Sequence, residues 1–115
     1  MPRNVVRFGE IACRIFGTQT VEPTDLDELV TTARTESVRL RASRFQFIAE
    51  FLMFAGRPDE ALAMIEESVA AQLQDHQWMQ HCPMLAPLPG QPRFGELAAI
   101  VADRARAVIA AVLES

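Results

Sequence analysis

Apolar residues recur three or four positions apart along most of the chain, a spacing typical of helices that bury one face. The first such stripe precedes Gly17 and consists of Val5, Phe8, Ile11 or Ala12, and Ile15. The last begins after Pro92 and consists of Phe94, Leu97, Val101, Ala105, Val108 and Val112. No segment shows the two-residue alternation of a half-buried strand. The pattern therefore predicts an all-α fold.

A second helix is predicted to begin at about residue 25. Thr24 and Asp27 have the spacing of a capping box, and Asp25 and Glu28 add negative charge near the positive end of the helix dipole. The following stretch is rich in threonine, which is a weak helix former. We therefore expect a break or a bend within residues 31–41, around residues 35–37.

The clearest pattern is a helical hairpin. Two apolar stripes flank a short polar turn, the first formed by Phe45, Ile48, Ala49, Leu52 and Ala55 and the second by Ala61, Ile65, Val69 and Leu73. In the turn, Gly56 can adopt the left-handed conformation that ends a helix, and Pro58 suits the first turn of the next. Asp59 and Glu60 complement the dipole of that second helix.

Residues 42–75 resemble a tetratricopeptide repeat, in which pairs of antiparallel helices recur about every 34 residues. The alignment places Ala61 at the small position of the second helix and Phe45 at a site commonly held by tryptophan. Ser68 stands where alanine is usual. The resemblance implies tetratricopeptide-like hairpins, with residues 1–41 forming N-terminal helices of the same single domain, residues 1–115.

Residues 42–113 resemble the C-terminal end of repeat regions in bacterial multidomain signalling proteins, including serine/threonine kinases and adenylate cyclases, with residues 76–115 as the cap and final helix. The residues that carry this resemblance are Trp78, Cys82, Pro83, Leu85, Pro87, Leu88, Pro92, Arg93 and Phe94. The kinase and cyclase motifs themselves are not in the chain. The resemblance implies a Pro-rich C-terminal cap and a final capping helix, because a stack of repeats needs a terminal unit to cover its last apolar face. We assign the structural cap to Trp78, Cys82, Pro83, Leu85, Leu88, Pro92 and Phe94.

Charge and cysteine content limit the function classes. The chain has 11 basic residues, all arginine, against 15 acidic ones, for a net charge of -4. Such a balance disfavours binding to nucleic acid or to an anionic membrane. The N-terminal segment is not typical of a signal peptide. Cys13 and Cys82 form no Cys-x-x-Cys pair, so we expect a cytoplasmic protein with reduced thiols.

The segment around Trp78 also contains residues with reactive side chains. Asp75, His76, His81 and Cys82 have the chemistry of zinc ligands, but their spacing directs them apart on a short helix. A Cys82 nucleophile would need a base and an orienting group, which a sequence neighbour such as His81 rarely provides. We therefore predict no catalytic residues, no metal and no cofactor, so that the chain is not an enzyme.

The surface of the hairpin is the remaining candidate. Residues 44–54 contain four phenylalanines, more than one helix face can hide. In tetratricopeptide domains the first helices line a concave groove, and by register Ser43, Gln46, Glu50, Met53 and Phe54 would face it. Arg34, Arg39, Arg41 and Arg44 form a basic cluster that is either a solvated face or a site for phosphate or an acidic peptide. The candidate partner-binding residues are Ser43, Gln46, Glu50, Met53, Phe54, Arg41 and Arg44.

We expect a non-catalytic protein–protein interaction or adaptor module. Its partner would be a protein or peptide, and the chain would act as a homodimer or as a subunit of a larger assembly, since one hairpin is below the usual minimum of three repeats. One alternative is a helical regulator that binds a small molecule, with Gln46, Glu50 and the arginines as polar groups. Another is a small helical enzyme that uses Cys82 and His81.

Overall fold

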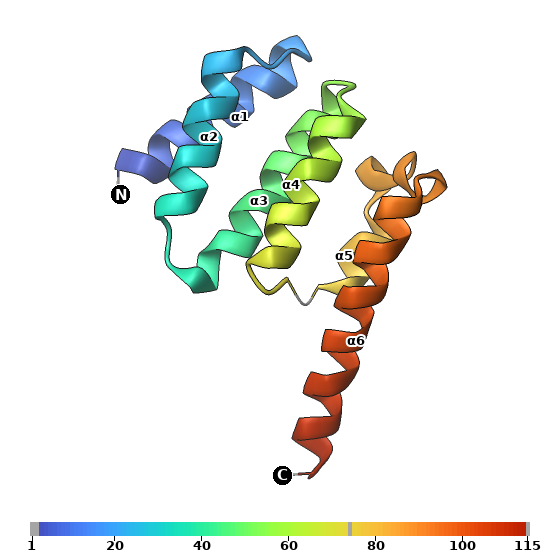
Figure 1. Ribbon diagram of the computed structural model, residues 1–115. Coiled ribbons are helices and arrows are strands. Elements are labelled where there is room, and N and C mark those ends of the chain that lie inside the picture. Colours follow the sequence, from blue (N-terminus) through green and yellow to red (C-terminus); the bar gives the residue numbers. More distant parts are fainter. Residues whose placement is uncertain (1–2, 74, 115) are drawn as a thin grey trace.

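The computed structural model describes residues 3–73 and 75–114, and every regular element in these ranges is a helix. The all-α prediction is therefore confirmed. In chain order the elements are α1 (Arg3–Thr18), α2 (Pro23–Thr35), α3 (Val38–Phe54), α4 (Pro58–Ala70), α5 (His76–His81), the 3-10 turns η1 (Pro83–Leu85) and η2 (Leu88–Gly90), and α6 (Pro92–Glu114). The helices lie side by side (Figure 1), and the molecule is flat, with extents of 46 × 35 × 18 Å.

The start of α2 differs from the prediction. The helix begins at Pro23, and the predicted capping box of Thr24 and Asp27 is wrong. Proline is favoured in the first turn because its φ is already helical and it has no N–H to leave unpaired. The residue before it, Glu22, is the N-cap, and its backbone N–H donates to the Asp25 carboxylate at 3.3 Å.

The expected break in residues 31–41 is confirmed, because α2 ends at Thr35 and α3 begins at Val38. The predicted turn between α3 and α4 is confirmed as well. Gly56 has a φ of +75°, and the N–H of Arg57 donates to the carbonyl of Leu52 at 2.9 Å. This left-handed glycine ends α3 and lets α4 return alongside it (Figure 1).

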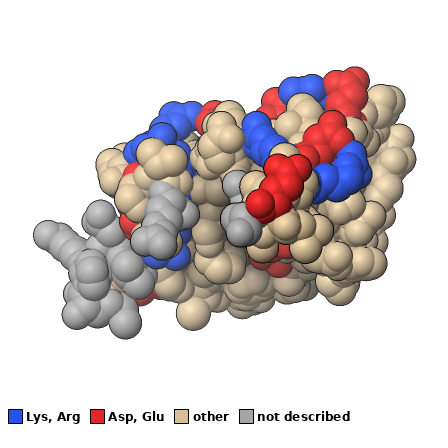
Figure 2. All heavy atoms as spheres, turned by 90° about the horizontal axis from the view of Figure 1, so that it is seen from below, with Lys and Arg blue, Asp and Glu red and all other residues tan. Residues whose placement is uncertain are grey.

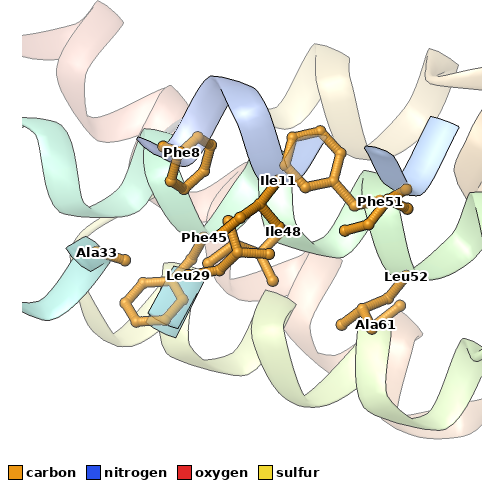
Figure 3. Close-up of a cluster of buried hydrophobic side chains, with 10 residues drawn as sticks. Phe8, Ile11, Leu29, Ala33, Phe45, Ile48, Phe51, Leu52 and Ala61 are labelled. Carbon is orange, nitrogen blue, oxygen red and sulfur yellow. The ribbon is translucent and has the colours of Figure 1, made fainter. Parts of the chain in front are cut away.

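Two hydrophobic clusters hold the array together. The first joins α1, α2, α3 and the start of α4, with Phe45 and Ile48 of α3 at its centre (Figure 3). The second joins α4, α5, the 3-10 turns and α6. Met53 and Met64 pack against both clusters, so the core is continuous through the α3–α4 hairpin.

Three helices use the same buried pattern, which is an arginine and a phenylalanine followed by apolar residues three, four and seven positions after the phenylalanine. The pattern occurs in α1 as Arg7, Phe8, Ile11, Ala12 and Ile15, in α3 as Arg44, Phe45, Ile48, Ala49 and Leu52, and in α6 as Arg93, Phe94, Leu97, Ala98 and Val101. The phenylalanine and the positions three and seven residues after it are buried in all three helices. One helix type therefore recurs along the array.

The apolar stripe of α6 is buried only in its first half. Phe94, Leu97 and Val101 are buried, whereas Val108 and Val112 are 44% and 67% exposed. Figure 1 shows the reason, since the second half of α6 extends beyond the other helices. The predicted continuation of the stripe is present, but the rest of the described chain does not bury it.

Candidate functional site

A largely apolar groove lies between α1 and α3, and Met84 of η1 also lines it. Its volume is about 440 Å³. The residues that line it are Phe8, Gly9, Phe16, Arg44, Phe47, Glu50, Phe51 and Met84. We call this surface the aromatic groove.

Phenylalanine rings form both the floor and the walls of the aromatic groove. Phe8 and Phe51 are buried, and their ring centroids lie 5.8 Å apart. Phe16 meets Phe51 edge-on at 5.4 Å and also packs against Phe54 at 4.8 Å. Phe16 and Phe47 remain 39% and 41% exposed. Exposed rings that rest on buried rings make a preformed apolar surface, because their neighbours already limit their rotation.

The groove has one basic and one acidic side chain. The Arg44 guanidinium lies 5.5 Å from the centre of the Phe8 ring and 3.6 Å from the Glu36 carboxylate. The Glu50 carboxylate accepts a hydrogen bond from the Cys82 thiol at 3.4 Å. Because both charges already have partners, the groove offers mainly apolar contact.

The predicted partner-binding residues do not share one surface. Arg44 and Glu50 line the aromatic groove, and Phe54 packs beside it against Phe16. Ser43 and Gln46 instead line a separate hollow of about 470 Å³ with residues of the segment between α4 and α5. The positions are close in sequence but lie on different sides of α3.

Two further members of that set are engaged inside the fold. Met53 is partly buried and packs against both hydrophobic clusters, and it does not line the aromatic groove. Arg41 is also partly buried, and it donates to the backbone carbonyl of Glu36 at 3.4 Å. Substitution of either residue should therefore act mainly by lowering the stability of the fold.

The predicted basic cluster is divided between two helices. Arg34 belongs to α2 and pairs with Glu67 at 3.1 Å, while Arg44 belongs to α3. The side chain of Arg39 lies outside the described residues. In Figure 2, which shows the molecule from below, red and blue side chains lie next to one another rather than in separate fields. This mixing favours the solvated-face interpretation of the arginines.

Several arginines connect neighbouring helices. Arg7 of α1 pairs with Glu28 of α2 at 2.7 Å, and Arg93 of α6 pairs with Glu66 of α4 at 2.6 Å. Glu28 keeps a lowered pKa because it accepts hydrogen bonds from Arg7. Arg104 of α6 donates to the carbonyl of Val69 at 2.6 Å, at the end of α4.

The residues assigned to the cap lie at the α6 side of the hairpin, at different depths. Leu85, Leu88 and Phe94 are buried in the second cluster, and Trp78 and Cys82 are partly buried against it. Pro83 and Pro92 are exposed, and they begin the short turn η1 and the long helix α6 respectively. The prolines divide the segment into α5, η1 and η2, and none of these three elements was predicted separately.

Cys82 has a raised pKa, chiefly because burial penalises the thiolate and secondarily because Glu50 lies nearby. We therefore expect iodoacetamide to alkylate Cys82 more slowly than the exposed Cys13. The rate for Cys82 should also rise at a higher pH than is usual for a cysteine thiol. Glu50→Gln should move the profile of Cys82 toward neutral pH, and Glu96→Gln should leave it unchanged. Peptide mass spectrometry measures both rates. Identical profiles in the parent and Glu50→Gln would contradict this account of the thiol.

Metal ligands and membrane spans give no further candidate. Within residues 3–73 and 75–114, no three His, Cys, Asp or Glu side chains come together in a way that could hold a metal ion. In the same ranges no helix combines the length and the apolar character needed to cross a bilayer.

The predicted partner-binding set lacks Phe47 and Phe51 of α3, as well as the groove residues of α1 and η1. Phe8 was predicted only as a core residue, and Phe16 and Met84 were not predicted to share a surface with Phe47. A signal for Phe16 existed, because it lies outside the apolar stripe of its own helix and an aromatic residue in that position needs another neighbour.

No family model matches the chain, and comparison with curated proteins and with solved structures finds no significant match to either.

Proposed function

We propose that the chain is a non-catalytic protein–protein interaction module, and that the aromatic groove binds an apolar segment of a partner protein. The observation that carries the proposal is the pair of exposed rings, Phe16 and Phe47, held on a floor of buried rings. Clustered aromatic side chains in a concave surface are typical of the residues that dominate binding energy at interfaces.

The helical architecture supports a tetratricopeptide-like interpretation. The α3–α4 hairpin has the glycine turn that the resemblance implies, and the pattern of α3 recurs in α1 and α6. The aromatic groove lies along α1 and α3, which are the first helices of their pairs. In an array of this kind, such helices provide a continuous surface for an extended or helical segment.

The alternative function, a regulator that binds a small molecule, is compatible with the size of the aromatic groove. A volume of about 440 Å³ is within the range of small-ligand sites. Such sites usually contain several polar groups that fix the ligand. Here only Arg44 and Glu50 supply charge, and Gln46 faces the other hollow. The apolar lining therefore favours a protein segment over a polar metabolite.

An enzyme that uses Cys82 has less support from the site. Cysteine chemistry requires a thiolate, and burial raises the pKa of Cys82. The Glu50 carboxylate accepts a hydrogen bond from this thiol, but its negative charge also raises the pKa of Cys82 and so disfavours the thiolate.

Selection from a library of displayed peptides tests the proposal. We expect enriched sequences with apolar residues three or four positions apart, or in an extended apolar run. Phe47→Ser and Phe16→Ser should each weaken binding of a selected peptide by about tenfold or more, because removal of a central interface aromatic costs upwards of about 1.4 kcal/mol. Fluorescence polarisation of the labelled peptide gives the dissociation constants.

Val38→Ser is the matched control, since Val38 is an exposed apolar residue of α3 outside the groove. Its peptide affinity should equal that of the parent. Peptides that bind Phe47→Ser and Phe16→Ser as well as the parent would show that the groove is not the binding surface. Circular dichroism spectra should establish that every variant is folded.

A further inference from the structure

The second half of α6 is apolar on almost every side. Residues 107–113 read AVIAAVL and contain no polar side chain. Val108, Ile109 and Leu113 are 44%, 60% and 81% exposed. We call residues 102–114 the α6 tail. A helix without a polar face is normally buried, so an exposed one indicates a missing neighbour.

The exposed residues of the tail continue the face that packs inside the fold. Val108 follows the buried Val101 by two helical turns, and Ile109 follows Ala105 by about one turn. Val101 belongs to the face that packs in the second cluster against α4, α5 and η2. The same surface therefore runs past the end of the molecule, where Figure 1 shows the tail projecting.

A hollow of about 300 Å³ lies where the tail leaves the rest of the molecule. Ala102, Ala105, Arg106 and Ile109 of α6 line one side, and Asp75, His76 and Gln77 at the start of α5 line the other. The alanines leave space beside Ile109 because their side chains end at Cβ. A leucine side chain is small enough to enter this apolar part of the hollow, with the polar side chains at its rim.

We propose that two copies of this chain pair through antiparallel α6 tails, with the twofold axis at Ile109. Leu113 lies four residues after the axis and Ala105 lies four residues before it, so an antiparallel pair places each Leu113 opposite the partner's Ala105. Leu113 and the hollow are on the same flank of α6, and a twofold axis brings like flanks together. Each Leu113 therefore enters the hollow beside α5 of the other copy.

A second copy fits the observations better than the aromatic groove of a neighbouring molecule would. A tail bound in that groove would be a head-to-tail contact, which propagates into an open chain of molecules unless it closes by symmetry. The antiparallel pair is closed with two copies and covers the tail and the hollow together. A contact limited to two short helix tails and one hollow is smaller than a standard interface, which predicts a weak dimer.

The first experiment measures the molar mass of the full chain by light scattering over a range of concentrations. The parent should rise from one chain toward two, and Ile109→Glu should remain a single chain throughout. Ile100→Glu is the matched control, because Ile100 is 40% exposed on the opposite side of α6 and should leave dimerisation unchanged. A parent that stays monomeric, or a dimer lost equally in both variants, would overturn the proposal.

The second experiment establishes how the tails are oriented. In a Cys13→Ser background, Ile109→Cys should form a disulfide-linked dimer on mild oxidation, since the axis brings the two cysteines together. Leu113→Cys should not, because the two positions would be about 12 Å apart along the helices. Cross-linking of Leu113→Cys alone would indicate parallel tails and refute the arrangement.

The dimer is independent of the proposed function, because the aromatic groove is formed by α1, α3 and η1. Phe47→Ser should therefore weaken peptide binding by about tenfold or more and leave the dimer intact. Ile109→Glu should abolish the dimer and leave the peptide affinity unchanged. If Phe47→Ser abolished the dimer, the tail would occupy the groove of another copy and the antiparallel pair would be wrong.

Discussion

Replacement of Phe45 with alanine is expected to lower the free energy of unfolding by about 3–5 kcal/mol, the usual effect of removing a fully buried aromatic ring. Phe45 is 1% exposed and lies among side chains from α1, α2 and α3 (Figure 3). Three helices would have to move to fill the space that the ring leaves, so the cavity should largely persist. Urea denaturation followed by circular dichroism measures the change.

Phe47→Ala is the matched control for this prediction. Phe47 is on the same helix but is 41% exposed in the aromatic groove, and its loss should cost less than about 1 kcal/mol. Equal destabilisation by the two alanine substitutions would mean that the first cluster is not packed around Phe45. A change in the denaturant slope would instead indicate a different unfolded state.

Leu88→Ala is expected to destabilise the protein by about 2–5 kcal/mol, toward the upper part of the range for buried leucines. Leu88 is fully buried although it belongs to the short 3-10 turn η2, where it lies between Pro87 and Pro89. The two prolines restrict the backbone on either side, which leaves little freedom to collapse onto the cavity. Trp78 packs against the same cluster, so its fluorescence and the circular dichroism signal should change together during unfolding.

Leu40→Ala provides the comparison for Leu88. Leu40 lies on α3 and is 44% exposed, and its substitution should change stability by no more than about 0.5–1 kcal/mol. If Leu88→Ala were equally mild, the segment from α5 to η2 would contribute little to the core. If the fluorescence of Trp78 changed well before the helical signal, that segment would unfold as a separate unit.

The repeated helix pattern could have been read from the sequence. Phe8, Phe45 and Phe94 each follow an arginine and each start the same apolar spacing, which needs no coordinates to detect. The hairpin turn at Gly56 was also predictable, because turn chemistry and helix ends depend on a few consecutive residues. The start of α2 at Pro23 was missed because two pairs with capping-box spacing overlap there, Glu22 with Asp25 and Thr24 with Asp27, and the second pair was chosen.

The aromatic groove was only partly predictable. Register placed Glu50 and Phe54 near a groove, but it also placed Ser43, Gln46 and Met53 there. Exposed residues of one helix point in several directions, and the sequence does not state which neighbour covers each one. Phe16 and Phe47 are 31 positions apart, and only the packing of α1 on α3 brings them to the same groove.

From its sequence alone, this protein is a set of helices with identifiable stripes, caps and turns, because those features depend on contacts within a few residues. The tertiary structure decided which apolar stripes pack against one another. It buries the first half of the α6 stripe against α4 and α5 and leaves the second half exposed, although the spacing of apolar residues is the same in both. The physical reason is that burial depends on where the neighbouring helices end, and local sequence carries no record of that distance.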